Sequence, residues 1–212
     1  MIPLAIDMSI KIWYRFAMAN NEKQETIIKA ALEVFCNYGF SKTRMADVAR
    51  KAGVSYGLVY HYFGSKEVLF DTIVNMWWRA LYGVLEEQKA STDDFPKKLI
   101  KIVEFFFDTY QDNPNLISIF VTEVSRSSIY RTSRGLEKFR KFFSLCEEIM
   151  KQGQDTGFLR NDIKPHYLTY VFLGGIEAFI SILVLGKEPL NRSRKNRAMD
   201  AIIKVFLEGA KI

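Results

Sequence analysis

The most informative segment of the chain is TRMADVARKAGVSYGLVYHYFGSKEVL, residues 43–69. It holds two short amphipathic helical segments joined by a turn at Gly53, which is the pattern of a helix-turn-helix. Ala49 is small enough to let the two helices cross closely, and Gly53 supplies the backbone freedom that the turn needs. Thr43 is expected to cap the first helix and Ser55 the second, because short polar side chains accept hydrogen bonds from the free N–H groups of a first turn.

The sequence on either side of this segment predicts an all-α protein. Apolar residues recur at helical spacing from Asn21 onward, and no stretch sustains the period-two alternation of a strand. Besides the short helices of the motif, we expect helices over residues 22–38, 65–89, 94–112, 115–127, 133–153, 165–186 and 195–210. The predicted organisation is an N-terminal extension (1–19), a helix-turn-helix domain (20–66) and a larger helical domain (67–212).

The N-terminal extension has two interpretations. Met18 directly precedes a good helix start, so residues 1–17 either derive from an upstream start codon or form an extra amphipathic segment that packs on the body. Asp7 and Lys11 interrupt its apolar stretch, which lacks the order of a secretory signal.

Composition and charge narrow the class of protein. Hydrophobic residues make up 49% and charged residues 25% of the 212 residues, which is ordinary for a globular protein. The net charge of +6 is compatible with a polyanionic partner. We find no run of about 18 apolar residues, and so expect no membrane-spanning helix. The usage of cysteine predicts a reducing, cytoplasmic compartment. Cys36 and Cys146 lack the number and spacing of a disulfide framework or a zinc site, and both are expected to be small core residues.

The order of features along the motif is more specific than any one of them. The pattern V-A-x-x-A-G-V-S-x-G-x-x-Y-x-Y-F covers residues 48–63, and S-K-E follows at residues 65–67. Over about residues 22–75 this order closely resembles the TetR family of bacterial and archaeal repressors. The resemblance implies an N-terminal three-helix DNA-binding domain and a C-terminal helical domain that binds a ligand and forms a homodimer.

The resemblance also implies which residues contact double-stranded operator DNA. The helix over residues 56–62 would lie in the major groove, with its start reading bases and its aromatic pair contacting phosphates. The expected DNA-binding residues are Thr43, Arg44, Ser55, Tyr56, Gly57, Tyr60, His61 and Lys66. This reading helix lacks Arg, Asn and Gln, the usual bidentate base readers. We therefore expect tyrosines, phosphate contacts and DNA shape to supply much of the selectivity.

The dimer is expected to form through the last two helices, as in the TetR family. One reading helix covers only a few base pairs, so two half-sites are needed for useful affinity. The expected interface residues are Phe172, Gly174, Gly175, Ala178, Phe179, Leu183 and Val205. The alternative is that the apolar segment 167–186 is simply the core of a monomer.

The expected effector is small and apolar, and lipid-like or a fatty acyl-CoA. Residues 113–127 and the pattern G-x-x-x-G-F-L-R-x-D at 153–162 are similar to TetR regulators of lipid metabolism. The candidate ligand-binding residues are Phe105, Phe106, Tyr110, Phe120, Glu123, Phe142, Phe143 and Glu177. The alternative is that the aromatic residues only pack the core and that the two glutamates face solvent.

An enzyme has little support in the sequence. His61 and His166 lie far apart, and no nucleophile elbow, phosphate loop or metal-ligand cluster is present, so we expect no catalytic residue, no metal and no cofactor. The predicted function is a ligand-responsive transcriptional repressor. Two alternatives remain open, namely a DNA-binding factor whose C-terminal domain binds a protein instead of a ligand, and a transcriptional activator.

Overall fold

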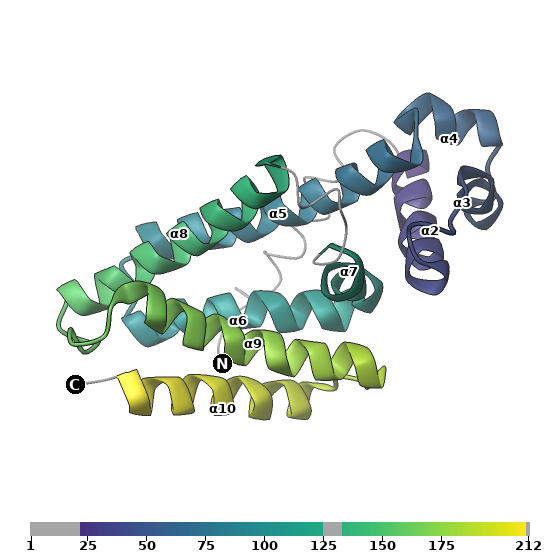
Figure 1. Ribbon diagram of the computed structural model, residues 1–212. Helices are drawn as coiled ribbons and strands as arrows, with labels where there is room; N and C mark the ends of the chain where they lie inside the picture. The colour runs from purple at the N-terminus through teal and green to yellow at the C-terminus, as the bar shows by residue number, and fades with distance from the viewer. Residues whose placement is uncertain (1–21, 125–132, 211–212) are drawn as a thin grey trace. The chain divides into compact units, whose positions relative to one another are not determined.

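The computed structural model describes residues 22–124 and 133–210, except for the side chains of residues 123, 124, 133 and 134. This part of the chain is helical, as the sequence predicts (Figure 1). The helices are α2 (Glu22–Tyr38), α3 (Met45–Ala52), α4 (Tyr56–Phe63), α5 (Lys66–Ala90), α6 (Phe95–Asp112), α7 (Pro114–Ile119), the π-helix η1 (Phe120–Val124), α8 (Ser133–Asp155), α9 (Pro165–Gly186) and α10 (Arg192–Ala210). The predicted N-terminal extension lies outside the described residues.

The helix predicted over residues 115–127 differs from the one observed. It is α-helical only as far as Ile119, and the π-helix η1 follows directly. Asn113 caps α7 by accepting a hydrogen bond from the N–H three residues ahead at 3.3 Å. Pro114 fits the first turn because proline has no N–H to leave unpaired there. Residues 125–127 lie outside the described residues.

The predicted cap of α3 is wrong by one residue. Arg44, in an extended backbone conformation, occupies the N-cap position. Its N–H donates to the carboxylate of Asp47 at 3.2 Å, which satisfies one donor of the first turn. Thr43 is buried instead, and its hydroxyl donates to the carbonyl of Gly39 at 2.8 Å.

The turn between α3 and α4 has the predicted chemistry. Gly53 has a φ of 66°, in the left-handed region where a side chain strains the backbone. Ser55 caps α4, because its Oγ accepts a hydrogen bond from the N–H of Leu58 at 3.2 Å. These two residues fix the point at which the chain leaves α3 and begins α4.

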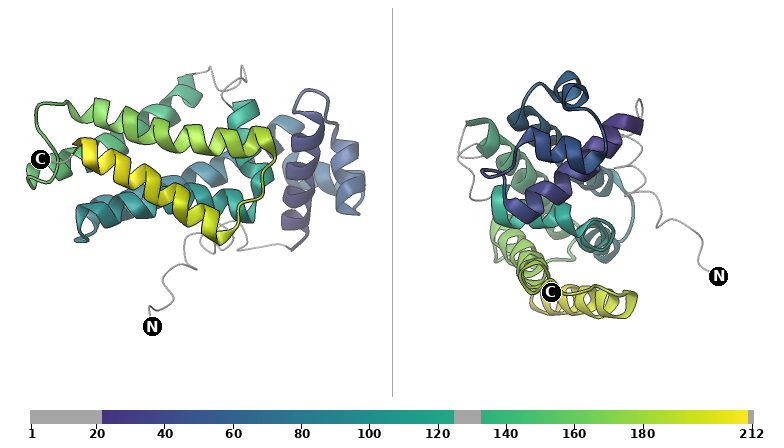
Figure 2. Two further views of the ribbon diagram at one scale, coloured as in Figure 1. Left: turned by 90° about the horizontal axis from the view of Figure 1, so that it is seen from below. Right: turned by 90° about the vertical axis from the view of Figure 1, so that its right-hand side faces the viewer.

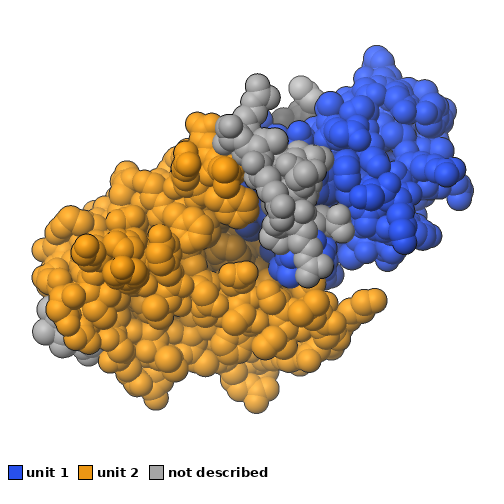
Figure 3. Space-filling model, viewed as in Figure 1, with its two compact units in different colours: residues 1–80, 113–127 blue, residues 81–112, 128–212 orange. Residues whose placement is uncertain are grey.

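The described chain divides into two compact units, which Figure 3 colours separately. Unit 1 spans residues 1–80 and 113–127, and unit 2 spans residues 81–112 and 128–212. Helix α5 contributes its first part to unit 1 and its last turns to unit 2. The predicted domain boundary at residue 66 was drawn from the motif and stays a prediction.

Unit 1 is built around α2, which packs against α3 and α7, while α3 packs against α4. Phe35 and Phe70 meet edge to face with ring centroids 5.4 Å apart, and Phe40 lies 4.8 Å from Phe70. These rings join α2, the loop after it and α5. The prediction that Cys36 is a core residue is wrong, because it follows Phe35 by one position and turns to the exposed side of α2.

Unit 2 is organised around α9, which packs against α6, α8 and α10. Figure 2 shows α9 and α10 lying side by side. The apolar side chains of α9 that enter the core are Leu168, Phe172, Leu173, Ile176, Ile180, Leu183 and Val184. The prediction for Cys146 is confirmed: it is buried on α8, and burial raises the pKa of its thiol to about 12.

Helix α9 is long and apolar enough, by length and composition alone, to cross a membrane. This result differs from the sequence-based prediction of no membrane-spanning helix, which considered only uninterrupted apolar runs. The core helix of a soluble protein passes the same test, and α9 places much of its apolar surface in the core of unit 2.

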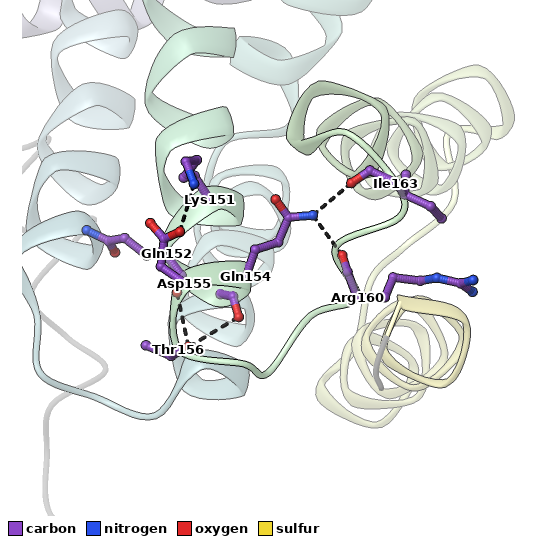
Figure 4. Close-up of polar contacts among 8 residues, drawn as sticks. Lys151, Gln152, Gln154, Asp155, Thr156, Arg160 and Ile163 are labelled. Atoms are coloured by element: carbon purple, nitrogen blue, oxygen red, sulfur yellow. Dashed lines mark hydrogen bonds and ion pairs between the residues drawn. The ribbon is translucent and has the colours of Figure 1, made fainter.

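Hydrogen bonds from the end of α8 hold the segment that follows this helix in place (Figure 4). Gln154 donates from Nε2 to the carbonyls of Arg160 and Ile163, both at 2.7 Å. The backbone N–H of Arg160 donates to the carbonyl of Ala210 at 2.9 Å, which ties the end of α10 to this segment. A Cβ on Gly153 would lie 2.6 Å from the ring of Phe95 and 2.9 Å from the side chain of Leu159, so a larger residue would have to displace these side chains. The G-x-x-x-G-F-L-R-x-D pattern therefore has a packing reason.

A buried ion pair links α6 to α10. Lys195 contacts Asp108, and their side chains are only 11% and 12% exposed. Glu104 and Asp112 lie one turn to either side of Asp108 on α6. Burial is the main cause that raises the pKa of both carboxyl groups. Lys195 thus neutralises the central carboxylate of an acidic row.

Replacing Lys195 by methionine should lower the free energy of unfolding by about 3–5 kcal/mol, because Asp108 would stay buried without its partner. Urea unfolding followed by circular dichroism measures the loss. Lys204→Met is the matched control, since Lys204 is an exposed lysine of the same helix and should change little. The double variant Asp108→Leu/Lys195→Met should recover most of the loss. Equal stability of Lys195→Met and wild type would show that the pair contributes nothing.

Candidate functional site

The outer face of α4 carries an exposed aromatic pair. Tyr56 and Tyr60 are 52% and 40% exposed, and their ring centroids lie 4.6 Å apart. A side-chain hydrogen bond with Tyr60 raises the pKa of Tyr56. His61 is also exposed, and the centroid of its ring lies 5.5 Å from that of Tyr62. Exposed aromatic rings are unusual on a helix face that only water contacts, because burying their large apolar area would be favourable.

Gly57 has no structural reason within the described chain to be glycine. It lies inside α4, its φ is not in the left-handed region, and a Cβ there would meet nothing within 4 Å. Glycine inside a helix costs about 1 kcal/mol relative to alanine. The open surface beside Tyr56 and Tyr60 is therefore suited to the close approach of another molecule.

The inner face of α4 holds this surface in place. Val59 is fully buried and Phe63 is 4% exposed, and α4 packs against α3. The Ser55 cap fixes the first turn, and Gly64 ends the helix with its N–H donating to the carbonyl of Tyr60 at 2.8 Å. The outward side chains thus sit on a well-anchored helix.

Two of the predicted DNA contacts are engaged inside the protein. Thr43 is bonded to Gly39, as described above. Lys66 donates from Nζ to the carbonyls of Phe40 and Ser41 at 2.9 and 3.4 Å, and its Nζ lies 4.5 Å from the centre of the Phe40 ring. Lys66 thereby ties the start of α5 to the loop after α2. The other predicted contacts, on α4 and at the start of α3, are exposed: Arg44, Ser55, Tyr56, Gly57, Tyr60 and His61.

Four of the predicted effector residues come together in unit 2. An aromatic series runs from α6 through α8 to α9, with successive ring centroids 5.7, 6.5, 5.3 and 5.6 Å apart. Its members are Phe105, Phe106, Phe142, Phe143 and Tyr170. Phe105 is buried, whereas Phe143 is 36% exposed. Tyr170 was not among the predicted effector residues, because it lies in a segment that is apolar on nearly every side.

The remaining predicted effector residues are not part of this series. Phe120 belongs to unit 1, where its ring lies 3.9 Å from that of Trp77. The Tyr110 hydroxyl lies within hydrogen-bonding distance of the last carbonyls of α9 and the loop after it. Glu177 is exposed, which favours the solvent-facing alternative. The side chain of Glu123 lies outside the described residues.

The predicted dimer residues divide between the core and the surface. Phe172 and Leu183 are buried, and the Phe172 ring packs on Phe206 of α10 with centroids 5.1 Å apart. Gly175 is half-buried beside Ile202. Four others are exposed: Gly174, Ala178, Phe179 and Val205.

The exposed side of α9 carries an apolar row that the sequence analysis only partly identified. We define the α9 stripe as Tyr167, Val171, Gly174, Ala178, Ile182 and Leu185, all exposed and spaced by three or four residues. Its signal in the sequence was masked because the buried side of the same helix is equally apolar.

Across the described residues, the structure contains no group of three or more His, Cys, Asp and Glu side chains able to hold a metal ion.

Comparison with known proteins shows which families have sequences similar to this chain. Residues 27–73 match the model of bacterial regulatory proteins of the tetR family, and residues 96–182 match that of the tetracyclin repressor-like C-terminal domain. The transcriptional repressor NicS of Pseudomonas putida is 27% identical over 149 residues, which cover 69% of this chain and 70% of NicS. The transcriptional regulator BetI of Stenotrophomonas maltophilia is 26% identical over 77% of this chain and 80% of BetI.

Solved structures share the fold. The fatty acid degradation regulator FadR of Bacillus halodurans superposes with a TM-score of 0.75 at 18% identity, covering 90% of this chain and 97% of that one. FadR of Bacillus subtilis in complex with stearoyl-CoA gives 0.71 at 18% identity, covering 87% and 98%. The two family models together span the helix-turn-helix and most of the larger helical domain. The chain therefore belongs to the TetR family of transcriptional regulators, which are DNA-binding proteins and not enzymes.

Proposed function

We propose that this TetR-family regulator is a homodimeric repressor that a small, apolar effector of the fatty acyl class releases from operator DNA. The observation that carries the proposal is the outer face of α4. It exposes Tyr56, Tyr60 and His61 around Gly57, a glycine that the fold of the described chain does not itself require. Such a surface is useful to a partner that approaches the backbone closely, as the edge of a DNA base does in the major groove.

The DNA contacts divide by chemistry. Ser55 and Tyr56 at the start of α4 read base edges, while Tyr60 and His61 contact phosphates on the groove wall. Arg44, exposed at the start of α3, supplies a charge near the backbone. Since α4 lacks bidentate base readers, the spacing of two half-sites in a dimer adds to the selectivity.

The homodimer forms through the α9 stripe and the exposed side of α10. Ile182 and Leu185 are 60% and 75% exposed, and Val205 of α10 is 72% exposed. A contiguous apolar row of this kind is typical of a surface that a partner covers. Gly174 and Ala178 at its centre allow two helices to approach closely. The location proposed for the protein is the cytoplasm, where bacterial operator DNA lies.

Two observations support a fatty acyl effector. The fatty acid metabolism regulator protein of Bacillus subtilis is 20% identical over 78% of this chain and 86% of that protein, and the FadR neighbour from that organism binds stearoyl-CoA. In this chain, the aromatic series gives unit 2 a run of apolar rings that matches a hydrocarbon ligand. The repressor part of the proposal has separate support, because the relative NicS is named a transcriptional repressor.

The proposed regulation acts through α5. This helix runs without a break from Lys66, which holds the loop after α2, to Ala90 in unit 2. An effector that binds one arrangement of unit 2 better than another shifts the population of α5 positions, and with it the spacing of the two reading helices.

The proposal predicts that stearoyl-CoA releases the protein from its operator in a gel-shift titration. A shift of the operator affinity by about tenfold or more corresponds to about 1.4 kcal/mol of coupling, an ordinary value for such regulators. Coenzyme A without the acyl chain is the control and should leave the complex intact. Tighter operator binding with stearoyl-CoA would contradict release by this effector. An operator affinity that stearoyl-CoA leaves unchanged would contradict the proposal of a fatty acyl effector.

Gly57→Ala should raise the free energy of unfolding by about 0.5–1 kcal/mol and yet weaken operator binding about tenfold or more. The gain follows from helix propensity, and the loss follows from a methyl group placed against the DNA. Gly83→Ala is the matched control, because Gly83 is an exposed helical glycine of α5 with nothing within 4 Å of its added Cβ. It should raise stability alone. Normal operator affinity in Gly57→Ala would show that α4 does not approach DNA closely at this position.

Arg44→Ala and Lys66→Ala should separate a phosphate contact from a positioning residue. Arg44→Ala should reduce the slope of log affinity against log salt by about 0.9, because one phosphate contact is lost. Lys66→Ala should weaken binding and leave the slope unchanged, since its ammonium is held by Phe40 and Ser41. A slope reduced by about 0.9 in Lys66→Ala would instead make Lys66 a phosphate contact, as the sequence predicted.

A further inference from the structure

Gln88 is a buried polar residue on α5 in unit 2. It is 1% exposed, and no residue in the described part of the chain donates a hydrogen bond to its Oε1. It follows Leu81 and Leu85, both fully buried, at spacings that place all three on one face of the helix. An amide therefore stands in an otherwise apolar row.

Buried polar side chains elsewhere in unit 2 have partners. The hydroxyls of Thr109 and Thr169 donate to carbonyls one turn earlier at 2.6 and 3.0 Å. Lys98 donates to Gln152 at 3.2 Å, and Gln154 donates to two carbonyls at 2.7 Å. Gln88 departs from this pattern.

Folding alone does not account for a glutamine at this position. A carbonyl oxygen buried without a donor has given up its hydrogen bonds to water and gained none in return. Leucine has a similar helix propensity and would continue the row of Leu81 and Leu85. A residue that opposes local stability in this way points to a function that needs it.

Gln88 lies close to the meeting point of α5, α6 and α8. The carbonyl of the next residue, Lys89, accepts a hydrogen bond from Gln152 of α8 at 3.0 Å. Gln152 in turn accepts one from Lys98 of α6. Helices α6 and α8 also carry four members of the aromatic series. Gln88 therefore lies in unit 2 beside a residue that is hydrogen-bonded to α8, and the aromatic series lies seven or more residues further along α6 and α8.

We infer that Gln88 is the polar contact of the effector site and that its Oε1 accepts a hydrogen bond from a neutral donor on an otherwise apolar molecule. The inference rests on the proposed effector function of unit 2. A glutamine has no charge to compensate a buried cation, so a hydroxyl or an amide N–H fits better than an ammonium group. A bare hydrocarbon chain leaves Gln88 unpaired, whereas an acyl chain joined to coenzyme A carries amide and hydroxyl donors.

Two isomeric probes test the donor directly. Octan-1-ol carries a hydroxyl donor, and heptyl methyl ether has the same atoms without one. Calorimetric titration should show that the wild type binds the alcohol about tenfold more tightly than the ether, the value of one good hydrogen bond. Gln88→Leu should bind both probes alike. The inference is overturned if the wild type binds no alcohol or has no preference, or if the preference survives in Gln88→Leu.

Urea unfolding of the same variant is an independent test. Gln88→Leu should keep or raise the midpoint, because it removes an acceptor that has no partner. The matched control is Gln154→Leu, a buried glutamine of the same unit whose two hydrogen bonds Figure 4 shows. It should lower the midpoint. An equal fall in both variants would mean that Gln88 is satisfied within the folded protein, and the inference would fail.

Operator release separates this inference from the proposed function. Gln88→Leu should bind operator DNA normally and need about tenfold more stearoyl-CoA than the wild type for release. Release of both proteins at the same concentration leaves the repressor proposal standing and sinks the role of Gln88. Failure of the wild type to bind DNA or to respond to stearoyl-CoA would sink the repressor proposal, while the alcohol and ether comparison still decides the role of Gln88.

Discussion

The packing of α4 on α3 is the contact on which the proposed DNA-binding surface depends. An isolated helix of eight residues is unstable in water, so α4 owes its order to Val59 and Phe63 on its inner side. The left-handed turn at Gly53 and the cap at Ser55 set where that inner side begins. With the apolar half committed to packing, the other half is free to present tyrosines, a histidine and a bare stretch of backbone.

Local signals predicted most of the fold because they act over a few residues. Ser55 and Gly53 are read directly from the sequence, and helical spacing located nearly every helix. The errors are also local. A shift of one position moved the cap from Thr43 to Arg44, and one position beyond Phe35 turned Cys36 outward, since neighbours on a helix point about 100° apart.

Contacts between distant segments could not be predicted in this way. Lys195 and Asp108 are 87 residues apart, and nothing in either local pattern indicates that they meet. The same limit applies to the candidate effector site, where the aromatic clusters were visible but their grouping was not. Phe120 belongs with Trp77 in unit 1, while Tyr170 joins the series in unit 2. A row of residues on one helix is readable from sequence, but the partner of that row is not.

The unequal environments of the two cysteines have a practical consequence. Cys146 is buried and its thiol has a pKa of about 12, so it is scarcely ionised and hardly reactive at neutral pH. Cys36 is exposed on α2, in the same unit as α4. A thiol-directed spin label would therefore attach at one place in each chain. In a dimer, the dipolar coupling between two such labels reports the separation of the two DNA-binding units in solution, without any engineered cysteine.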